Sequence, residues 1–229
     1  MKVSLSNEQL LHYVVKQLDY LLPDGYVVNQ PILMQALNLA LQRCEKCFCH
    51  IAVRGYCEHG EALFSHLHSD QYSTFLYFLM NSCWRMGAEK QLCDKIMNLQ
   101  RIISGCFVSY KCGLPDIFYL NHPVGTVIGN ANYSDYLVVF QNVTVNTHAV
   151  GQNGESDLFI GKGVCLCSGA KIIGGGQIGD RVSLGINSII YNKSVPNDNV
   201  VHLTEDGKCV VEKRKRTNCA AQEYFNIIL

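Results

Sequence analysis

The chain has 229 residues, of which 48% are hydrophobic, and its 19 basic and 19 acidic residues give a formal net charge of zero. This length suits one large domain or two small ones, and the apolar content is sufficient for a substantial core. Proteins that bind nucleic acids usually carry a basic excess, so the balanced charge argues against that class. We interpret the short basic run KRKR, residues 213–216, as solvated surface.

The N-terminal residues lack the continuous apolar segment and the small-residue cleavage site of a secretory signal. The apolar run FLYFLM, residues 75–80, is far too short to span a bilayer. We therefore expect a soluble, cytoplasmic protein that does not insert into a membrane.

Twelve cysteines are scattered along the chain. In a reducing cytoplasm such thiols behave as small apolar side chains rather than as a disulfide framework. The segment CEKCFCH (44–50), followed by Cys57 and His59, contains residue types that zinc accepts as ligands. Its second half is irregularly spaced and its first half falls within a predicted helix, so we expect no metal site.

The first part of the chain, to about residue 104, has a helical pattern. Ser6 and Gln9 form a predicted capping box, which is followed by apolar residues that recur on one helix face. Further helices are predicted to start near Pro31, after Asp70 and after Gly87. Each apolar face is suited to core packing, so this part is predicted to be a helical bundle.

Beyond residue 105 the apolar residues recur with a period of six. The clearest series is Ile160, Leu166, Ile172, Ile178, Leu184 and Ile190. An upstream series with the same spacing is Val127, Tyr133, Val139 and Val145. This period fits neither a helix nor an alternating strand. It fits a coil of three short flat faces with one large apolar residue per face pointing inward, and stacked coils of this kind form a prism.

Three segments of this repeat resemble a known family. LNHPVGTVIG (120–129), VFQNVTV (139–145) and GVCLCSGAKIIGG (163–175) are similar to hexapeptide-repeat acyltransferases, and most similar to serine acetyltransferase. The resemblance implies acetyl transfer from acetyl-CoA to a hydroxyl group.

The same resemblance implies an α+β architecture. We expect an α-helical domain over residues 1–104, a left-handed parallel β-helix over 105–200, and a C-terminal tail over 201–229. The family usually buries the flat faces of its prisms in trimers, so we expect a homotrimer or a dimer of trimers with active sites between chains. The apolar ending YFNIIL (224–229) is expected to dock within that oligomer.

Acetyl transfer requires a base that takes the proton of the attacking hydroxyl, and a neutral imidazole is suited to this role. The resemblance assigns the base to His122. The alternative is a structural histidine at the start of a strand. A carboxylate could orient the imidazole; Asp116, Asp135 and Asp157 are candidates, and Asp116 is nearest to His122 in sequence.

The six-residue phase breaks over residues 145–160, where we expect a protruding loop. The resembling enzymes carry a second active-site histidine at the end of this loop, whereas this chain has Ser-Asp at residues 156–157. His148, earlier in the loop, is therefore a candidate second catalytic histidine. Asn121 stands where the family has an acidic residue, and Asn121 and Asp157 are candidate substrate-binding residues. These departures leave the acceptor open.

CoA is expected to lie along the groove between adjacent prisms, because its pantetheine arm can hydrogen-bond to exposed backbone at the coil corners. The candidate contacts are Gly169, Ala170, Gly185 and Ser188, and Lys193 could meet a CoA phosphate.

Three functions are weighed. The leading hypothesis is an acetyl-CoA-dependent O-acetyltransferase that acts on serine or another small hydroxyl compound. The second is an acetyltransferase that acts on a sugar or nucleotide-sugar for surface polysaccharide. The third is a noncatalytic β-helix that serves assembly or binding.

Overall fold

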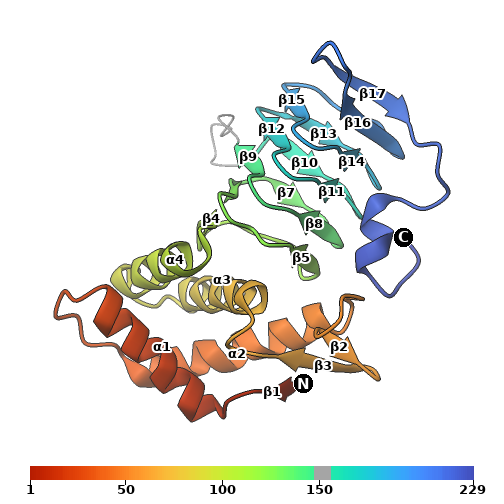
Figure 1. Cartoon of the computed structure of the whole chain (residues 1–229). Helices are drawn as coiled ribbons and strands as arrows, with labels where there is room; N and C mark the ends of the chain where they lie inside the picture. Colours follow the sequence, from red (N-terminus) through yellow and green to blue (C-terminus); the bar gives the residue numbers. More distant parts are fainter. Residues whose placement is uncertain (147–155) are drawn as a thin grey trace. The chain divides into compact units, whose positions relative to one another are not determined.

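The structure is a computed structural model that describes residues 1–146 and 156–229 (Figure 1). The predicted catalytic residue His148 lies outside the described residues. The chain divides into two compact units. Unit 1 comprises Met1–Cys49 and Arg54–Lys111, and unit 2 comprises His50–Val53 and Cys112–Leu229.

Unit 1 is built around helices α1 (Asn7–Leu21), α2 (Gln30–Phe48), α3 (Ser69–Arg85) and α4 (Lys90–Ser104). The predicted capping box is confirmed, because the Ser6 hydroxyl accepts the N–H of Gln9 and the Gln9 side chain accepts the N–H of Ser6. Helix α3 is the centre of this unit, since nearly all of its side chains are buried.

A small sheet accompanies these helices and was not predicted. Its order is β1 (Lys2–Val3), β3 (Glu61–Phe64), β2 (Cys57–Glu58). Strands of two to four residues are too short for an alternating pattern to stand out in the sequence. Strand β4 (Phe107–Val108) follows α4 at the end of this unit.

The cysteines of the CEKCFCH segment belong to the core of unit 1. Cys44 and Cys47 are fully buried on α2, and burial raises the pKa of the Cys44 thiol. Over the described ranges, no group of three or more His, Cys, Asp or Glu side chains is placed to hold a metal ion. In the same ranges, no helix combines the length and the apolar character needed to cross a bilayer.

Unit 2 is a stack of coils whose strands form three parallel faces (Figure 1). The β5 face contains β5 (Phe118–Leu120), β8 (Leu137–Val139), β11 (Cys165–Leu166), β14 (Ser183–Leu184) and β16 (Asn199–Leu203), with β17 (Cys209–Lys213) antiparallel at its end. The β6 face contains β6 (Val127–Ile128), β9 (Thr144–Asn146), β12 (Lys171–Ile173) and β15 (Ile189–Tyr191). The β7 face contains β7 (Asn132–Tyr133), β10 (Leu158–Ile160) and β13 (Gly176–Ile178).

The strand register confirms the period of six. Ile160 pairs with Ile178, Leu166 with Leu184 and Ile172 with Ile190, always between successive coils. All six of these side chains are 3% exposed or less. The core of unit 2 is therefore a column of aliphatic residues that runs through the stack.

The prediction for Val127 is wrong by one residue. Ile128 is the inward residue, 1% exposed and paired with Val145, whereas Val127 is 37% exposed. The reason is the length of the corner before it. Eight positions separate the inward residues Leu120 and Ile128, against six between Val139 and Val145 in the next coil.

Glycine after an inward isoleucine is required by the closeness of successive coils. A Cβ placed on Gly161 would lie 2.7 Å from the backbone nitrogen of Asp180 and 2.7 Å from the carbonyl carbon of Gly179. Real Cβ atoms do not approach backbone this closely, so a larger residue would force the two coils apart.

We predict that Gly161→Ala lowers the free energy of unfolding by about 1–3 kcal/mol, the range typical of overpacking a close contact. Gly113→Ala is the matched control, because its Cβ would meet nothing within 4 Å. We expect it to change stability by less than about 0.5 kcal/mol. Urea unfolding of the two variants measures both values, and equal stabilities would contradict the close-approach explanation.

Candidate active site

The long corner after β5, residues 121–126, is tied firmly to the next coil. The Thr126 side chain is fully buried, and its hydroxyl donates to the carbonyl of Phe140 at 2.7 Å. The same hydroxyl accepts the N–H of Val143 at 3.3 Å. Within the corner, the N–H of Val124 donates to the carbonyl of His122 at 2.7 Å. The backbone that carries His122 is thus held at both ends.

His122 has a left-handed backbone with φ of 47°, and its side chain is exposed. Such a φ is uncommon for residues other than glycine and costs on the order of 1 kcal/mol, so it persists only where the surroundings impose it. The bonds of Thr126 hold the corner in which it occurs. An exposed imidazole does not fit the alternative of a buried histidine at a strand start, and it leaves the ring accessible to a substrate.

Asn121 lies directly before His122 and faces the outer side of the β5 face. Its N–H donates to the carbonyl of Val139 at 2.8 Å, and its side-chain carbonyl accepts the hydroxyl of Tyr119 at 3.4 Å. An amide at this position therefore contributes a neutral polar group beside the imidazole.

The candidate carboxylates occupy different places. Asp116 is exposed and lies two residues before β5. Asp135 accepts the N–H of Ile117 at 2.9 Å, so its carboxylate joins two coils and serves the fold. Asp157 is exposed at the corner before β10, where its carbonyl accepts the N–H of Gly176 at 3.1 Å.

The predicted CoA residues divide between two edges of the prism. Gly169, Ala170, Gly185 and Ser188 lie in the corners that join the β5 face to the β6 face, which is also the edge of His122. The N–H of Gly169 donates to the carbonyl of Gln141 in the preceding coil at 3.0 Å, so these corners are stacked. Lys193 lies at the next edge, where its carbonyl is next to Gly176 and thus near Asp157.

The two predicted CoA residues of the His122 edge that have side chains are both buried. Ala170 and Ser188 are buried, and the Ser188 hydroxyl donates to the carbonyl of Val201 at 3.2 Å. The N–H of Gly185 also donates to the carbonyl of Val201, at 2.7 Å. These groups hold successive coils together, and their contact with CoA stays a prediction.

The C-terminal segment covers the outer side of the β5 face. Tyr224, at the end of the short 3-10 helix η1 (Ala220–Tyr224), stacks on Tyr119 with ring centroids 5.5 Å apart and meets Phe140 edge-on at 5.8 Å. Phe225 meets Tyr136 edge-on at 5.2 Å. Tyr224 and Phe225 of the apolar ending thus pack on their own chain, whereas Ile228 is 94% exposed. Docking of this ending within an oligomer stays a prediction.

Asp198 anchors this segment to the prism. Its carboxylate accepts two hydrogen bonds of 2.8 Å from Arg181 and one from Arg214. These bonds, those of Arg181 first, hold the pKa of Asp198 well below its usual range. Arg214 in turn donates to the carbonyls of Arg216 and Thr217, which fixes the course of the chain as it leaves β17.

Comparisons with known proteins find similarity to serine acetyltransferases. No family model matches the chain. A serine acetyltransferase of Synechococcus elongatus is 30% identical over 104 residues, which are 45% of this chain and 42% of that protein. The chain therefore spans less than half the length of this relative.

Solved structures agree on the fold. A serine acetyltransferase of Neisseria gonorrhoeae superposes with a TM-score of 0.69 over 95% of this chain and 83% of its own, at 18% identity. A serine acetyltransferase in complex with CoA superposes with a TM-score of 0.53 over 86% and 74% of the two chains, at 16% identity. The chain is serine acetyltransferase-like. This likeness rests on the shared fold and on part of the sequence.

The hydrogen bonds of Asp198 with Arg181 and Arg214 allow a test of how the C-terminal segment is anchored to the prism. We predict that Asp198→Asn lowers the free energy of unfolding by about 1–2 kcal/mol near neutral pH, because two arginines lose a charged partner that is partly exposed. A depressed carboxyl pKa stabilises the fold above the ordinary Asp value and ceases to do so as the pH falls toward the folded value. The difference between wild type and variant should therefore shrink below about pH 4.

Asp206→Asn is the control, since Asp206 pairs with Lys208 where both side chains are largely exposed. We expect no measurable change in stability for it, because solvent screens the pair. Urea unfolding at several pH values measures both variants, and a pH-independent loss in Asp198→Asn would argue against the charge network as its cause.

Proposed function

We propose that the protein is an acetyl-CoA-dependent O-acetyltransferase of the serine acetyltransferase type, acting in the cytoplasm with His122 as the base. The observation that carries this proposal is an exposed histidine in a strained, rigidly held corner of a coil stack that superposes on serine acetyltransferases. The solved relative with CoA bound supports acetyl-CoA as the donor.

The reaction needs no covalent enzyme intermediate. The acceptor oxygen attacks the thioester carbonyl carbon while neutral His122 takes the hydroxyl proton. The resulting oxyanion collapses, the carbon–sulfur bond breaks, and the CoA thiolate leaves and takes a proton from the imidazolium. Positioning of the two substrates supplies much of the acceleration, which suits a corner whose backbone is fixed by the coils around it.

The remaining catalytic roles are part of the same proposal. We assign Asp116 to orient the His122 imidazole, and Asn121 to contact the acceptor beside it. His148 is the candidate second catalytic histidine. Asp157 is assigned to the acceptor from the neighbouring edge of the prism.

The proposal includes an oligomer. In a left-handed β-helix that assembles as a homotrimer, or as a dimer of trimers, the His122 edge of one chain would face another edge of its neighbour. CoA would lie in that groove against Gly169, Ala170, Gly185 and Ser188, and Lys193 from the other edge would meet a CoA phosphate. This arrangement accounts for the division of the predicted residues between two edges.

A second acceptor class is favoured by one observation. Residues 156–157 are Ser-Asp where resembling enzymes carry a second histidine. A sugar or nucleotide-sugar acceptor, which offers several hydroxyls, is therefore the alternative to serine. The noncatalytic alternative is disfavoured by the exposure of His122.

We predict that His122→Ala lowers the rate of acetyl transfer by about 10²- to 10⁴-fold, the usual contribution of a general base. His12→Ala is the matched control, since His12 is an exposed histidine on α1 in unit 1. Thermal melting of both variants should match that of the wild type. Release of free CoA measures the rates, and an undiminished rate in folded His122→Ala would remove His122 from the mechanism.

The acceptor is identified by the same CoA-release measurement with serine, amino sugars and nucleotide-sugars as separate additions. Release stimulated by serine alone is the expected result. Release stimulated only by sugars would establish the alternative acceptor class. If no acceptor stimulated release and CoA did not bind, the noncatalytic hypothesis would replace the enzyme.

A further inference from the structure

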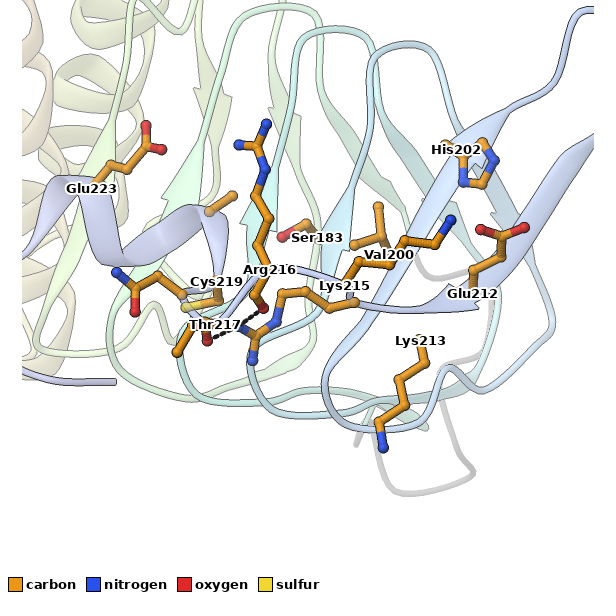
Figure 2. Close-up of a pocket in the computed structure, with 13 residues that line it drawn as sticks. Ser183, Val200, His202, Glu212, Lys213, Lys215, Arg216, Thr217, Cys219 and Glu223 are labelled. Carbon is orange, nitrogen blue, oxygen red and sulfur yellow. Dashed lines mark hydrogen bonds between the residues drawn. The ribbon is translucent and has the colours of Figure 1, made fainter.

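A cavity of about 650 Å³ lies between the outer side of the β5 face and the chain that follows β17 (Figure 2). We name it the β16 pocket. Its floor includes Ser183, Val200 and His202, and its walls come from residues 212–220 together with Glu223. We propose that this pocket binds a small phosphorylated molecule through its phosphate group.

The charge of the pocket favours an anion. Four cationic side chains, those of Lys213, Arg214, Lys215 and Arg216, and two carboxylates, those of Glu212 and Glu223, line it. Arg214 is already paired with Asp198, so an excess of one positive charge is left for a ligand in a chain whose net charge is zero. The run KRKR, which we interpreted as solvated surface, thus lines a concave site.

The cationic side chains of the pocket differ in whether they can contact a ligand. Figure 2 shows Arg216 extending beside Ser183 and Lys215 extending toward His202, while Lys213 points away from the sheet. Within the described ranges, the side chains of Lys215 and Arg216 form neither an ion pair nor a hydrogen bond with the protein. Both charges are therefore free to meet a ligand.

Arg214 holds the turn that carries Lys215 and Arg216 in place. Its guanidinium is committed to Asp198 and to the carbonyls of Arg216 and Thr217, and its side chain is 12% exposed. The turn that presents Lys215 and Arg216 is therefore fixed before any ligand arrives, which lowers the entropy lost on binding.

A phosphate suits this set of donors better than a carboxylate does. A phosphate monoester presents three acceptor oxygens and nearly two negative charges, which match a guanidinium, an ammonium and a hydroxyl such as that of Ser183 or Thr217. Val200 and Ala220 add apolar surface for the carbon skeleton. The volume is within the range of pockets that hold small molecules.

This inference does not require the proposed acetyl transfer. The phosphate could belong to a separate phosphorylated compound or to the 3′-phosphate of CoA, and the two sources share the same chemistry at the pocket. Dephospho-CoA lacks that 3′-phosphate and distinguishes them.

The test is calorimetric titration in a phosphate-free buffer with inorganic phosphate, AMP, CoA and dephospho-CoA as probes. The double variant Lys215→Gln/Arg216→Gln is compared with Lys208→Gln, which removes a lysine from the exposed turn of the same hairpin. We expect phosphate and AMP to bind wild type and Lys208→Gln alike, and to bind the double variant at least tenfold more weakly. Absence of phosphate and AMP binding to the wild type, or equal affinities in all three proteins, would overturn the proposal.

The CoA probes then identify the source. If the double variant loses affinity for CoA but not for dephospho-CoA, the 3′-phosphate of CoA occupies the pocket. If both CoA affinities are unchanged while phosphate and AMP binding is lost, a separate phosphorylated molecule is the ligand. Should the double variant not fold, the single variants Lys215→Gln and Arg216→Gln serve in its place. Failure of acetyl transfer would leave these titrations unaffected, so the two proposals fail separately.

Discussion

The pairing of aliphatic side chains between successive coils is the interaction on which unit 2 depends. Its strands are two to five residues long, and none could bury an apolar face alone. Each inward isoleucine, leucine or valine is covered by its counterpart one coil away, and the backbone hydrogen bonds of each face link the same coils. Stability therefore comes from repetition, and any residue that separates two coils weakens the contacts on all three faces.

The corner that carries His122 departs from this regular repeat. Regular corners of the same edge also hold left-handed residues, Asn142 and Asn187, so what sets the His122 corner apart is its length. Two additional residues open the first corner, and the buried Thr126 fixes the enlarged loop to the coil below. A rigid repeat thus carries a locally strained segment, and the strained segment is where the exposed imidazole stands.

The repeating features of the fold could be predicted from the sequence. Features that depend on one particular contact could not. The inward residues from Ile160 to Ile190 were identified because the same six-residue spacing recurs in every coil. Val127 was misplaced because one longer corner shifts the phase without changing the composition. The packing of Tyr224 on Tyr119, and the pocket that forms beneath the same segment, depend on how residues far apart in sequence meet, which no local pattern encodes. Within the candidate site, the residues around His122 were enough to nominate it as the base. Its backbone conformation and its exposure could not be predicted.

We propose that the stack presents His122 to two substrates at one edge of the prism. A crystal structure with CoA and an acceptor bound measures this most directly. We predict that the CoA sulfur and the acceptor hydroxyl converge on the His122 ring, with the hydroxyl at hydrogen-bonding distance, about 3 Å, from a ring nitrogen. A structure in which the CoA sulfur lies at another edge, with no substrate atom near His122, would contradict it.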